Sequence, residues 1–164
     1  MQRYAQFLII AFVLGLDQLT KALVVRHVPY LGEIKVTSFF SIVHGRNYGG
    51  LFGFLSNHEA GRYIFLILPL IIIGFLIYYV FFYRMTLSRR IALTFVLAGA
   101  IGNVYDRVVQ GYVTDFLDFF YGTHHWPAFN VADMAINFGI GLWLCVELLS
   151  SRKSAVTGSK ATGG

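Results

Sequence analysis

Charged residues and cysteine are scarce in this chain, and both shortages limit what the protein can be. Asp, Glu, Lys and Arg make up 13% of the 164 residues, while 57% are hydrophobic; soluble domains average about 25% charged residues. The composition therefore indicates a membrane protein. The single cysteine, Cys145, lies in an apolar run, which excludes a disulfide framework and a thiolate metal site. The net charge of +5 comes from dispersed basic residues, so it does not predict nucleic-acid binding.

Four apolar segments give the chain its predicted architecture. They cover residues 7–25, 63–83, 91–105 and 133–149. About 20 apolar residues suffice to cross a bilayer core, so we predict an all-α membrane protein with four transmembrane helices. Asp17 and Lys21 interrupt the first segment and no small-residue cleavage site follows it, which indicates a retained helix instead of a signal peptide. Residues 1–150 are predicted to form one domain, and residues 151–164 a disordered polar tail.

Basic residues indicate how the helices are oriented. On one side of a four-span topology lie Arg3, Arg84, Arg89, Arg90, Arg152 and Lys153. The positive-inside rule therefore predicts that both termini are cytoplasmic and that loops 26–62 and 106–132 face outward. In the first loop, EIKVTSFFSIVHGRN alternates as one or two strands do, and NYGGLFGF has the glycines of a turn. We expect a small extramembrane β-like platform in this first outward loop.

Most of the aspartates gather in one stretch, residues 99–133, between two apolar segments. They are Asp106, Asp115, Asp118 and Asp133. Ionisable groups at such a depth are expensive to bury and are functional candidates. Two aspartates brought together share a proton, so that one acts as general base and one as general acid, and the pair activates water against an amide. The residues alone leave open whether Asp115, Asp118 or Asp106 would pair with Asp133.

Other polar groups near the apolar segments have structural interpretations beside functional ones. Asp17 and Lys21 are four residues apart and share a helix face, which predicts an ion pair that neutralises both. Arg107 either grips a carboxylate or a lipid phosphate, or extends to the lipid headgroups. Asn130 is as good a helix N-cap as Asp133, which would leave Asp133 free for chemistry.

Competing functional sites are poorly represented. The chain has no GxSxG and no HExxH motif, and the adjacent His124 and His125 lack the spacing of a helical zinc site, so we interpret them as a loop tip. A proton-coupled membrane carrier or channel subunit is the alternative function, because such proteins use intramembrane Asp, Arg and Lys. Against it, the four segments show no internal repeat and the aspartates lie at one surface instead of at the midplane.

Four sequence motifs, taken in order, cover nearly the whole chain. They are DQLTK at residues 17–21, RNYGGLFG at 46–53, GNVYDRVVQGYVTDFLDF at 102–119 and WPAFNVADMAIN at 126–137. Together they resemble the lipoprotein signal peptidases (signal peptidase II), bacterial membrane aspartyl proteases that remove signal peptides from prolipoproteins. The resemblance covers residues 17–144. One position departs from it: Leu51 stands where the family usually has a small residue, which would narrow the platform near the substrate.

The resemblance implies roles for particular residues. The catalytic dyad falls on Asp115 and Asp133. The positions that line the site or hold the substrate are Asn47, Asn103, Arg107, Asn130 and Ala132. The supporting positions are Asp17, Lys21, Asp106, Gly111 and Asp118. In this arrangement we expect Asn130 and neighbouring backbone groups to stabilise the oxyanion.

The resemblance also implies the reaction and its setting. The expected activity is that of an intramembrane aspartyl endopeptidase, without metal or cofactor, that cuts diacylglyceryl-modified prolipoproteins on the N-terminal side of the lipidated cysteine. The expected location is the bacterial cytoplasmic (inner) membrane, with the active site near the outer, periplasmic surface. The expected partners are the lipid-modified prolipoprotein, membrane lipid and the inhibitor globomycin. The chain is expected to act as a monomer and to bind no nucleic acid.

Overall fold

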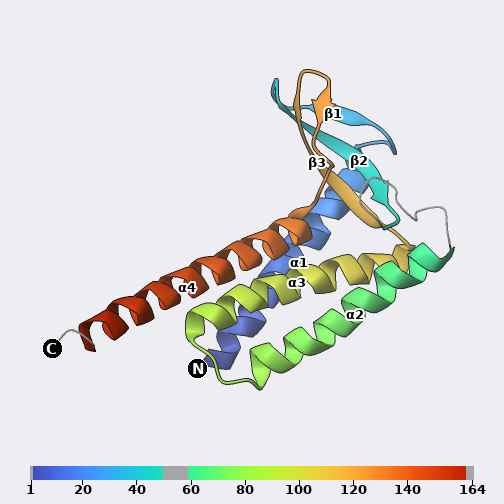
Figure 1. Ribbon diagram of the computed structural model, residues 1–164. Coiled ribbons are helices and arrows are strands. Elements are labelled where there is room, and N and C mark those ends of the chain that lie inside the picture. The colour runs from blue at the N-terminus through green and yellow to red at the C-terminus, as the bar shows by residue number, and fades with distance from the viewer. Residues whose placement is uncertain (1, 50–58, 162–164) are drawn as a thin grey trace.

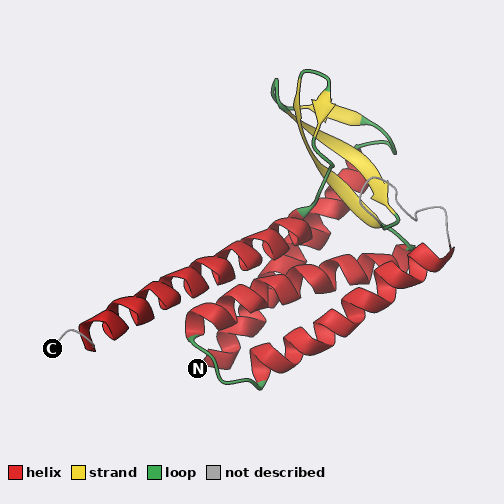
Figure 2. Ribbon diagram, in the orientation of Figure 1, coloured by secondary structure: helices red, strands yellow, loops and turns green. Residues whose placement is uncertain are grey.

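The structure is a computed structural model that describes residues 2–49 and 59–161. Helices form one bundle and a small sheet covers one of its ends (Figures 1 and 2). In chain order the elements are α1 (Gln2–His27), β1 (Glu33–Lys35), β2 (Phe40–Asn47), α2 (Glu59–Phe81), α3 (Leu87–Gln110), β3 (Val113–Tyr121), β4 (His124–His125) and α4 (Val131–Ala161). The predicted strands 50–58, with the glycine turn and Leu51, cannot be compared because those residues lie outside the described part of the chain.

Each of the four predicted apolar segments forms a helix. Among the described residues, four helices are long and apolar enough to cross a membrane, at residues 4–27, 63–81, 87–110 and 131–151. The prediction of four transmembrane helices is therefore confirmed, although the third helix extends beyond residues 91–105 at both ends. Helix α4 continues to Ala161, where the sequence predicted a disordered tail from residue 151, and no proline interrupts that stretch.

Helices α3 and α4 pack closely because glycines face the contact. A Cβ atom on Gly99 would collide with the carbonyl oxygen of Ala132, and one on Gly139 would lie 2.6 Å from the carbonyl oxygen of Ala92. Small residues of this kind let helix backbones approach in a membrane, where packing drives helix association. The close approach places the last turns of α3 beside the first turn of α4, which is where the candidate polar residues lie.

Helix α3 ends at a glycine in the left-handed conformation. Gly111 has φ 82° and its N–H donates to the carbonyl oxygen of Arg107 at 3.1 Å. Residues with a Cβ rarely adopt this conformation, so glycine is the usual residue at such a helix end. The chain then turns directly into β3, which carries Asp115.

The sheet forms a platform over the outer end of the bundle, and the platform is defined here as strands β1 to β4. The strand order is β1-β2-β3-β4, and every neighbouring pair is antiparallel. Strands β1 and β2 confirm the platform predicted in the first outward loop. Strands β3 and β4 were not predicted. The first four residues of β3, from Val113 to Phe116, are all buried, so the strand lacks the alternation that reveals a half-exposed strand in a sequence.

Candidate active site

Asp115 and Asp133 come from different elements and meet where the platform joins the bundle. Asp115 lies on β3, opposite Gly45 of β2, so that Asn47 lies two residues farther along the same neighbouring strand. Asp133 lies in the first turn of α4. Asp115 is buried and Asp133 is partly buried. The sequence had left three candidates for pairing with Asp133, and the structure brings Asp115 into its immediate hydrogen-bond network.

Both oxygens of Asp115 accept hydrogen bonds from asparagine side chains. Asn130 Nδ2 donates to Asp115 Oδ1 at 2.7 Å, and Asn47 Nδ2 donates to Asp115 Oδ2 at 2.9 Å. Amides are neutral, so they orient the carboxyl group without supplying the full charge that would hold it ionised. The loop side of Asn47 is fixed in turn, because its Oδ1 accepts the N–H of Gly49 at 2.9 Å.

Both oxygens of Asp133 accept hydrogen bonds as well. Asn103 Nδ2, on α3, donates to Asp133 Oδ1 at 2.7 Å, and the backbone N–H of Asn130 donates to Asp133 Oδ2 at 3.2 Å. In return Asn130 Oδ1 accepts the backbone N–H of Asp133 at 2.9 Å. This reciprocal pair is a capping box. Asn130 is the predicted N-cap of the fourth helix, and it contacts both aspartates.

Asn130 has no free amide hydrogen for a substrate. Its Nδ2 donates to Asp115 at 2.7 Å and also to Asn103 Oδ1 at 3.3 Å. The expectation that the Asn130 side chain stabilises an oxyanion is therefore wrong for this arrangement, because both of its N–H groups are engaged with the carboxylate and the neighbouring amide. Asn130 instead fixes the positions of the two aspartates relative to each other.

The environment of Asp115 shifts its proton equilibrium. Burial raises the pKa of Asp115 from 3.8 to about 6, and the nearby carboxylate of Asp133 raises it further, whereas the amides of Asn47 and Asn130 lower it. A carboxyl group that keeps its proton toward neutral pH can act as a general acid. Asp115 therefore has the property that one member of an aspartic dyad needs.

A second group of buried charges lies directly beneath, and we call Asp17, Lys21 and Asp106 the ion triad. Lys21 Nζ lies 2.7 Å from Asp17 Oδ2, so the predicted ion pair is present. The same ammonium lies 2.8 Å from Asp106 Oδ2, an ion-pair contact without hydrogen-bond geometry. All three side chains are buried. One cation thus lies between two carboxylates, which the sequence spacing could not indicate for Asp106.

The ion triad also holds the start of α4. Asp17 Oδ1 accepts the backbone N–H of Ala132 at 2.9 Å, and Ala132 is fully buried. Sequence reasoning missed Gln18, whose Nε2 donates to Asp106 Oδ1 at 2.9 Å and to Asp17 Oδ2 at 3.2 Å. Its place within the DQLTK motif was the available signal. Lys21 reaches Asn103 Oδ1 at 3.4 Å and so links the triad to the site above.

Arg107 lies close by with donors to spare. Its Nη1 donates weakly to the carbonyl oxygen of Asn103 at 3.4 Å, and its buried Nε has no hydrogen-bond partner among the described residues. Arg107 lines a cavity of about 390 Å³ together with Tyr48, Tyr63, Leu66, Val108 and Gly111. A buried guanidinium with an unused N–H beside a cavity is suited to bind carbonyl, carboxylate or phosphate oxygens.

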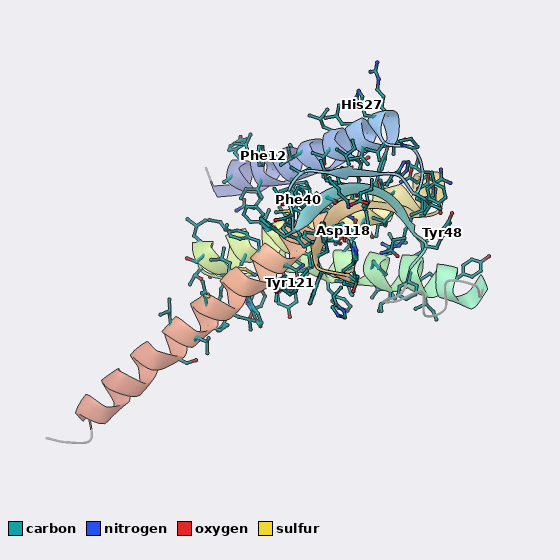
Figure 3. The ribbon with its side chains drawn as sticks, turned by 90° about the horizontal axis from the view of Figure 1, so that it is seen from above. Phe12, His27, Phe40, Tyr48, Asp118 and Tyr121 are labelled. Carbon is teal, nitrogen blue, oxygen red and sulfur yellow. The ribbon has the colours of Figure 1, made fainter. Side chains whose placement is uncertain are left out.

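Asp118 has a different partner and does not join the two aspartates. His125 Nδ1 lies 2.8 Å from Asp118 Oδ2. His124 and His125, predicted as a loop tip, form β4 and pair with Tyr121 and Phe120 of β3. Figure 3 shows Asp118 in a view onto the platform, between Tyr48 and Tyr121. In the described part of the chain, no three His, Cys, Asp or Glu side chains are grouped so that they could hold a metal ion.

Comparisons with known proteins agree on one family. A family model described as "Signal peptidase (SPase) II" matches residues 9–149. A lipoprotein signal peptidase of Azoarcus sp. (strain BH72) is 41% identical over 149 residues, which cover 90% of this chain and 85% of the relative. Lipoprotein signal peptidases of Aeromonas hydrophila and Francisella tularensis subsp. novicida are 38% and 33% identical, covering 94% and 90% of this chain and 93% and 94% of the relatives.

Solved structures agree with this result. One described as a bacterial membrane enzyme, at 2.3 Å resolution, superposes with a TM-score of 0.78 at 32% identity and covers 92% of this chain and 90% of the other. A second with the same description, at 1.9 Å resolution, has a TM-score of 0.78 at 30% identity and covers 88% and 92%. The arrangement of bundle and platform is therefore shared with known membrane enzymes.

Proposed function

The chain belongs to the signal peptidase II family, and from that premise we propose that it removes signal peptides from prolipoproteins with Asp115 and Asp133 as an aspartic dyad. The hydrogen bonding of the two carboxyl groups supports this assignment most directly. Each carboxyl oxygen accepts one N–H from Asn47, Asn103 or Asn130, and Asn130 binds both aspartates. The bonds orient the pair with neutral groups, which leaves the pair able to share a single proton.

The dyad acts on a water molecule held between its members. Asp133, at the positive end of α4, is the ionised member and takes a proton from the water as its oxygen attacks the scissile carbonyl carbon. Asp115 gives its proton to the carbonyl oxygen, and a neutral gem-diol forms. The C–N bond then breaks: Asp133 returns its proton to the leaving amine, and a hydroxyl proton goes back to Asp115. The cycle restores both residues and uses no metal and no cofactor.

Arg107 provides the binding of the substrate near the dyad. Its unpartnered Nε and the adjoining cavity of about 390 Å³ suit carbonyl or ester oxygens of a lipid-modified peptide. The substrate is a prolipoprotein cut on the N-terminal side of its diacylglyceryl-cysteine. Its acyl chains lie in the bilayer, so the lipid itself holds the scissile bond at a fixed depth and supplies positioning.

The membrane orientation follows from the basic residues. Arg84, Arg89 and Arg90 lie at the end of the bundle away from the platform. The positive-inside rule makes that end cytoplasmic and the platform periplasmic, in the inner membrane of a bacterium. The dyad then lies where a lipidated signal peptide reaches the outer leaflet, and a single chain contains the whole site.

A gel-shift cleavage assay tests the dyad. Purified protein in detergent is incubated with a diacylated prolipoprotein, with and without EDTA and globomycin, beside Asp115→Asn and Asp133→Asn. The matched control is Asp118→Asn, which removes a buried carboxylate from the same strand. We expect cleavage that resists EDTA, stops with globomycin, is lost in both dyad variants and persists in the control.

Other outcomes of this assay would reject parts of the assignment. Cleavage lost to EDTA would indicate a metal site in place of the dyad. Full activity in Asp115→Asn, with activity lost in Asp118→Asn, would move the general acid to Asp118. Absence of cleavage by folded wild-type protein would reject the peptidase assignment as a whole.

A further inference from the structure

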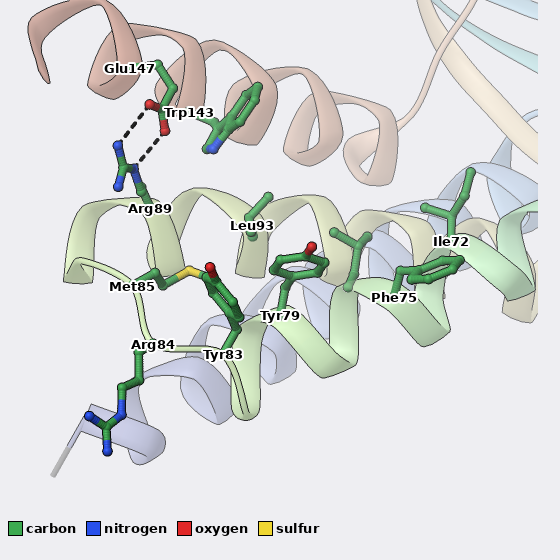
Figure 4. A pocket seen from close by; sticks show the side chains of 11 residues that line it. Ile72, Phe75, Tyr79, Tyr83, Arg84, Met85, Arg89, Leu93, Trp143 and Glu147 are labelled. Atoms are coloured by element: carbon green, nitrogen blue, oxygen red, sulfur yellow. Dashed lines mark hydrogen bonds and ion pairs between the residues drawn. The ribbon is translucent and has the colours of Figure 1, made fainter. Parts of the chain in front are cut away.

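A groove opens between α2, α3 and α4 at the end of the bundle away from the dyad. It has a volume of about 760 Å³, within the range of about 300–1,000 Å³ that bound ligands occupy. Figure 4 shows its lining side chains, which come from all three helices and from the turn between α2 and α3. The aspartates and Arg107 do not contribute to it. Nothing in the peptidase reaction therefore explains its chemistry.

The deeper walls of the groove are apolar. Ile72, Phe75 and Leu76 of α2 face Leu93 of α3 across it. These residues lie within helices that are long enough to cross the membrane, so their surroundings are hydrocarbon. An occupant must present an unbranched or flexible apolar portion to this part of the groove.

The mouth of the groove carries hydrogen-bond donors that the protein does not use. Tyr79, Tyr83 and Trp143 line it, and within the described residues no hydrogen bond involves their hydroxyl groups or indole N–H. Figure 4 shows the Trp143 indole nitrogen and the Tyr79 hydroxyl directed into the space between the helices. Tyr and Trp are favoured at membrane interfaces, where one end meets hydrocarbon and the other meets polar groups. The occupant must supply acceptor oxygens at this level.

The charge at the mouth is positive. Arg89 Nε and Nη2 donate to the two carboxylate oxygens of Glu147 at 2.7 and 2.8 Å, which neutralises that pair but leaves Nη1 free. Arg84 also lines the groove, and it has no ion pair within the described residues. Arg90, on the same turn of chain, donates only to the backbone oxygen of Tyr83. The acceptor oxygens are therefore expected to carry negative charge.

We propose that this groove is a binding site for one phospholipid of the leaflet opposite the platform, with preference for an anionic headgroup. One acyl chain lies along Ile72, Phe75 and Leu93, and the glycerol-ester and phosphate oxygens accept from Tyr79, Trp143 and Arg89. A basic pocket between helices on the cytoplasmic side is a recognised form of lipid site. A signal-peptide helix fits less well, because its backbone offers no free acceptors and its N-terminal region is positively charged.

The two tryptophans of the chain make the site measurable. Trp126→Phe leaves Trp143 as the only tryptophan, and Trp143→Phe leaves Trp126, which is exposed on the platform. Each variant is placed in bilayers of phosphatidylcholine and phosphatidylglycerol in which one lipid or the other carries brominated acyl chains. Bromine quenches a tryptophan only when its lipid lies against that residue, so the two quenching curves give the relative binding constant.

We expect phosphatidylglycerol to bind about five-fold better than phosphatidylcholine at Trp143, since one basic residue near the membrane surface contributes about that factor. At Trp126 the ratio should be near one. Arg84→Gln should bring the Trp143 ratio toward one, and Arg89→Gln, which leaves Glu147 unpaired, should bring it to one or below. Lys35→Gln on β1 removes a platform charge and should leave the ratio unchanged.

Three results would overturn the lipid site. The first is a ratio of one at Trp143 in the Trp126→Phe protein. The second is an equal preference at both tryptophans that survives Arg84→Gln and Arg89→Gln, which would reflect the general charge of the protein. The third is protection of Trp143 from both brominated lipids by an added signal peptide, which would assign the groove to the substrate instead.

Discussion

The dyad and the ion triad are two pairs of buried aspartates in one small region, and they differ in what lies between them. Asp17 and Asp106 have the ammonium of Lys21 at 2.7 and 2.8 Å. Asp115 and Asp133 have only amide N–H groups. A full cation favours two ionised carboxylates, whereas neutral donors favour neither protonation state as strongly. The same residue type is therefore structural in one place and suited to proton transfer in the other.

Removing the cation should erase the difference at the largest cost. Lys21→Met leaves Asp17 and Asp106 buried without a partner charge, which should destabilise the protein by about 3–5 kcal/mol. Thermal unfolding in detergent measures the effect, with Lys35→Met on the platform as the exposed control. The triple variant Asp17→Asn, Lys21→Met, Asp106→Asn should recover most of the loss, because no buried charge remains. Equal unfolding of Lys21→Met and wild type would contradict the structural role of the triad.

Removing the neutral link of the dyad should affect the reaction more than the fold. Asn130→Ala loses hydrogen bonds to both aspartates, so their relative position is no longer fixed, and kcat should fall about 100-fold. Cleavage kinetics with a diacylated prolipoprotein measure it, and thermal unfolding checks that the protein stays folded. A rise in KM with unchanged kcat would show that Asn130 binds substrate instead of positioning the dyad.

The shared proton should appear in the pH dependence. Burial and the neighbouring Asp133 raise the pKa of Asp115 to about 6, so Asp115 holds its proton below that pH and loses it above. If Asp115 is the acid, kcat/KM should fall about tenfold per pH unit above pH 6. Folding stability should also fall as pH rises from 3.8 to about 6, since the folded state holds this proton more tightly than the unfolded chain. A rate that increases through pH 6 would make Asp115 the base.

The smallest effect should come from a donor that reaches only one oxygen. Asn47→Ala removes the single bond to Asp115 Oδ2 and leaves the bond from Asn130 in place. The loss in kcat should be about tenfold, the value of one hydrogen bond. The comparison with Asn130→Ala in the same assay is decisive, because equal losses would mean that bridging both aspartates has no special effect.

The sequence predicted the features that depend on near neighbours. Hydropathy gave the four helices, the spacing of four gave the Asp17–Lys21 pair, and residue preference gave Asn130 as the helix cap. Features made by tertiary contacts were not predictable in this way. Asp106 reaches Lys21 from another helix, Asp118 reaches His125 across two strands, and β3 is buried on both faces, so none of them leaves a periodic pattern. The dyad pairing itself came from family resemblance, because residue chemistry alone allowed three choices.

The bond from the Ala132 backbone to Asp17 joins residues 115 positions apart in the chain. During synthesis, α1, α3 and Asp115 all leave the ribosome before α4 does, so an unfinished chain has one carboxyl group of the dyad and not the other. The first helix meanwhile holds the carboxylate that will receive the start of the last one. Peptidase activity therefore begins only when insertion is complete, and an incomplete chain in the membrane does not cut the signal peptides that pass beside it.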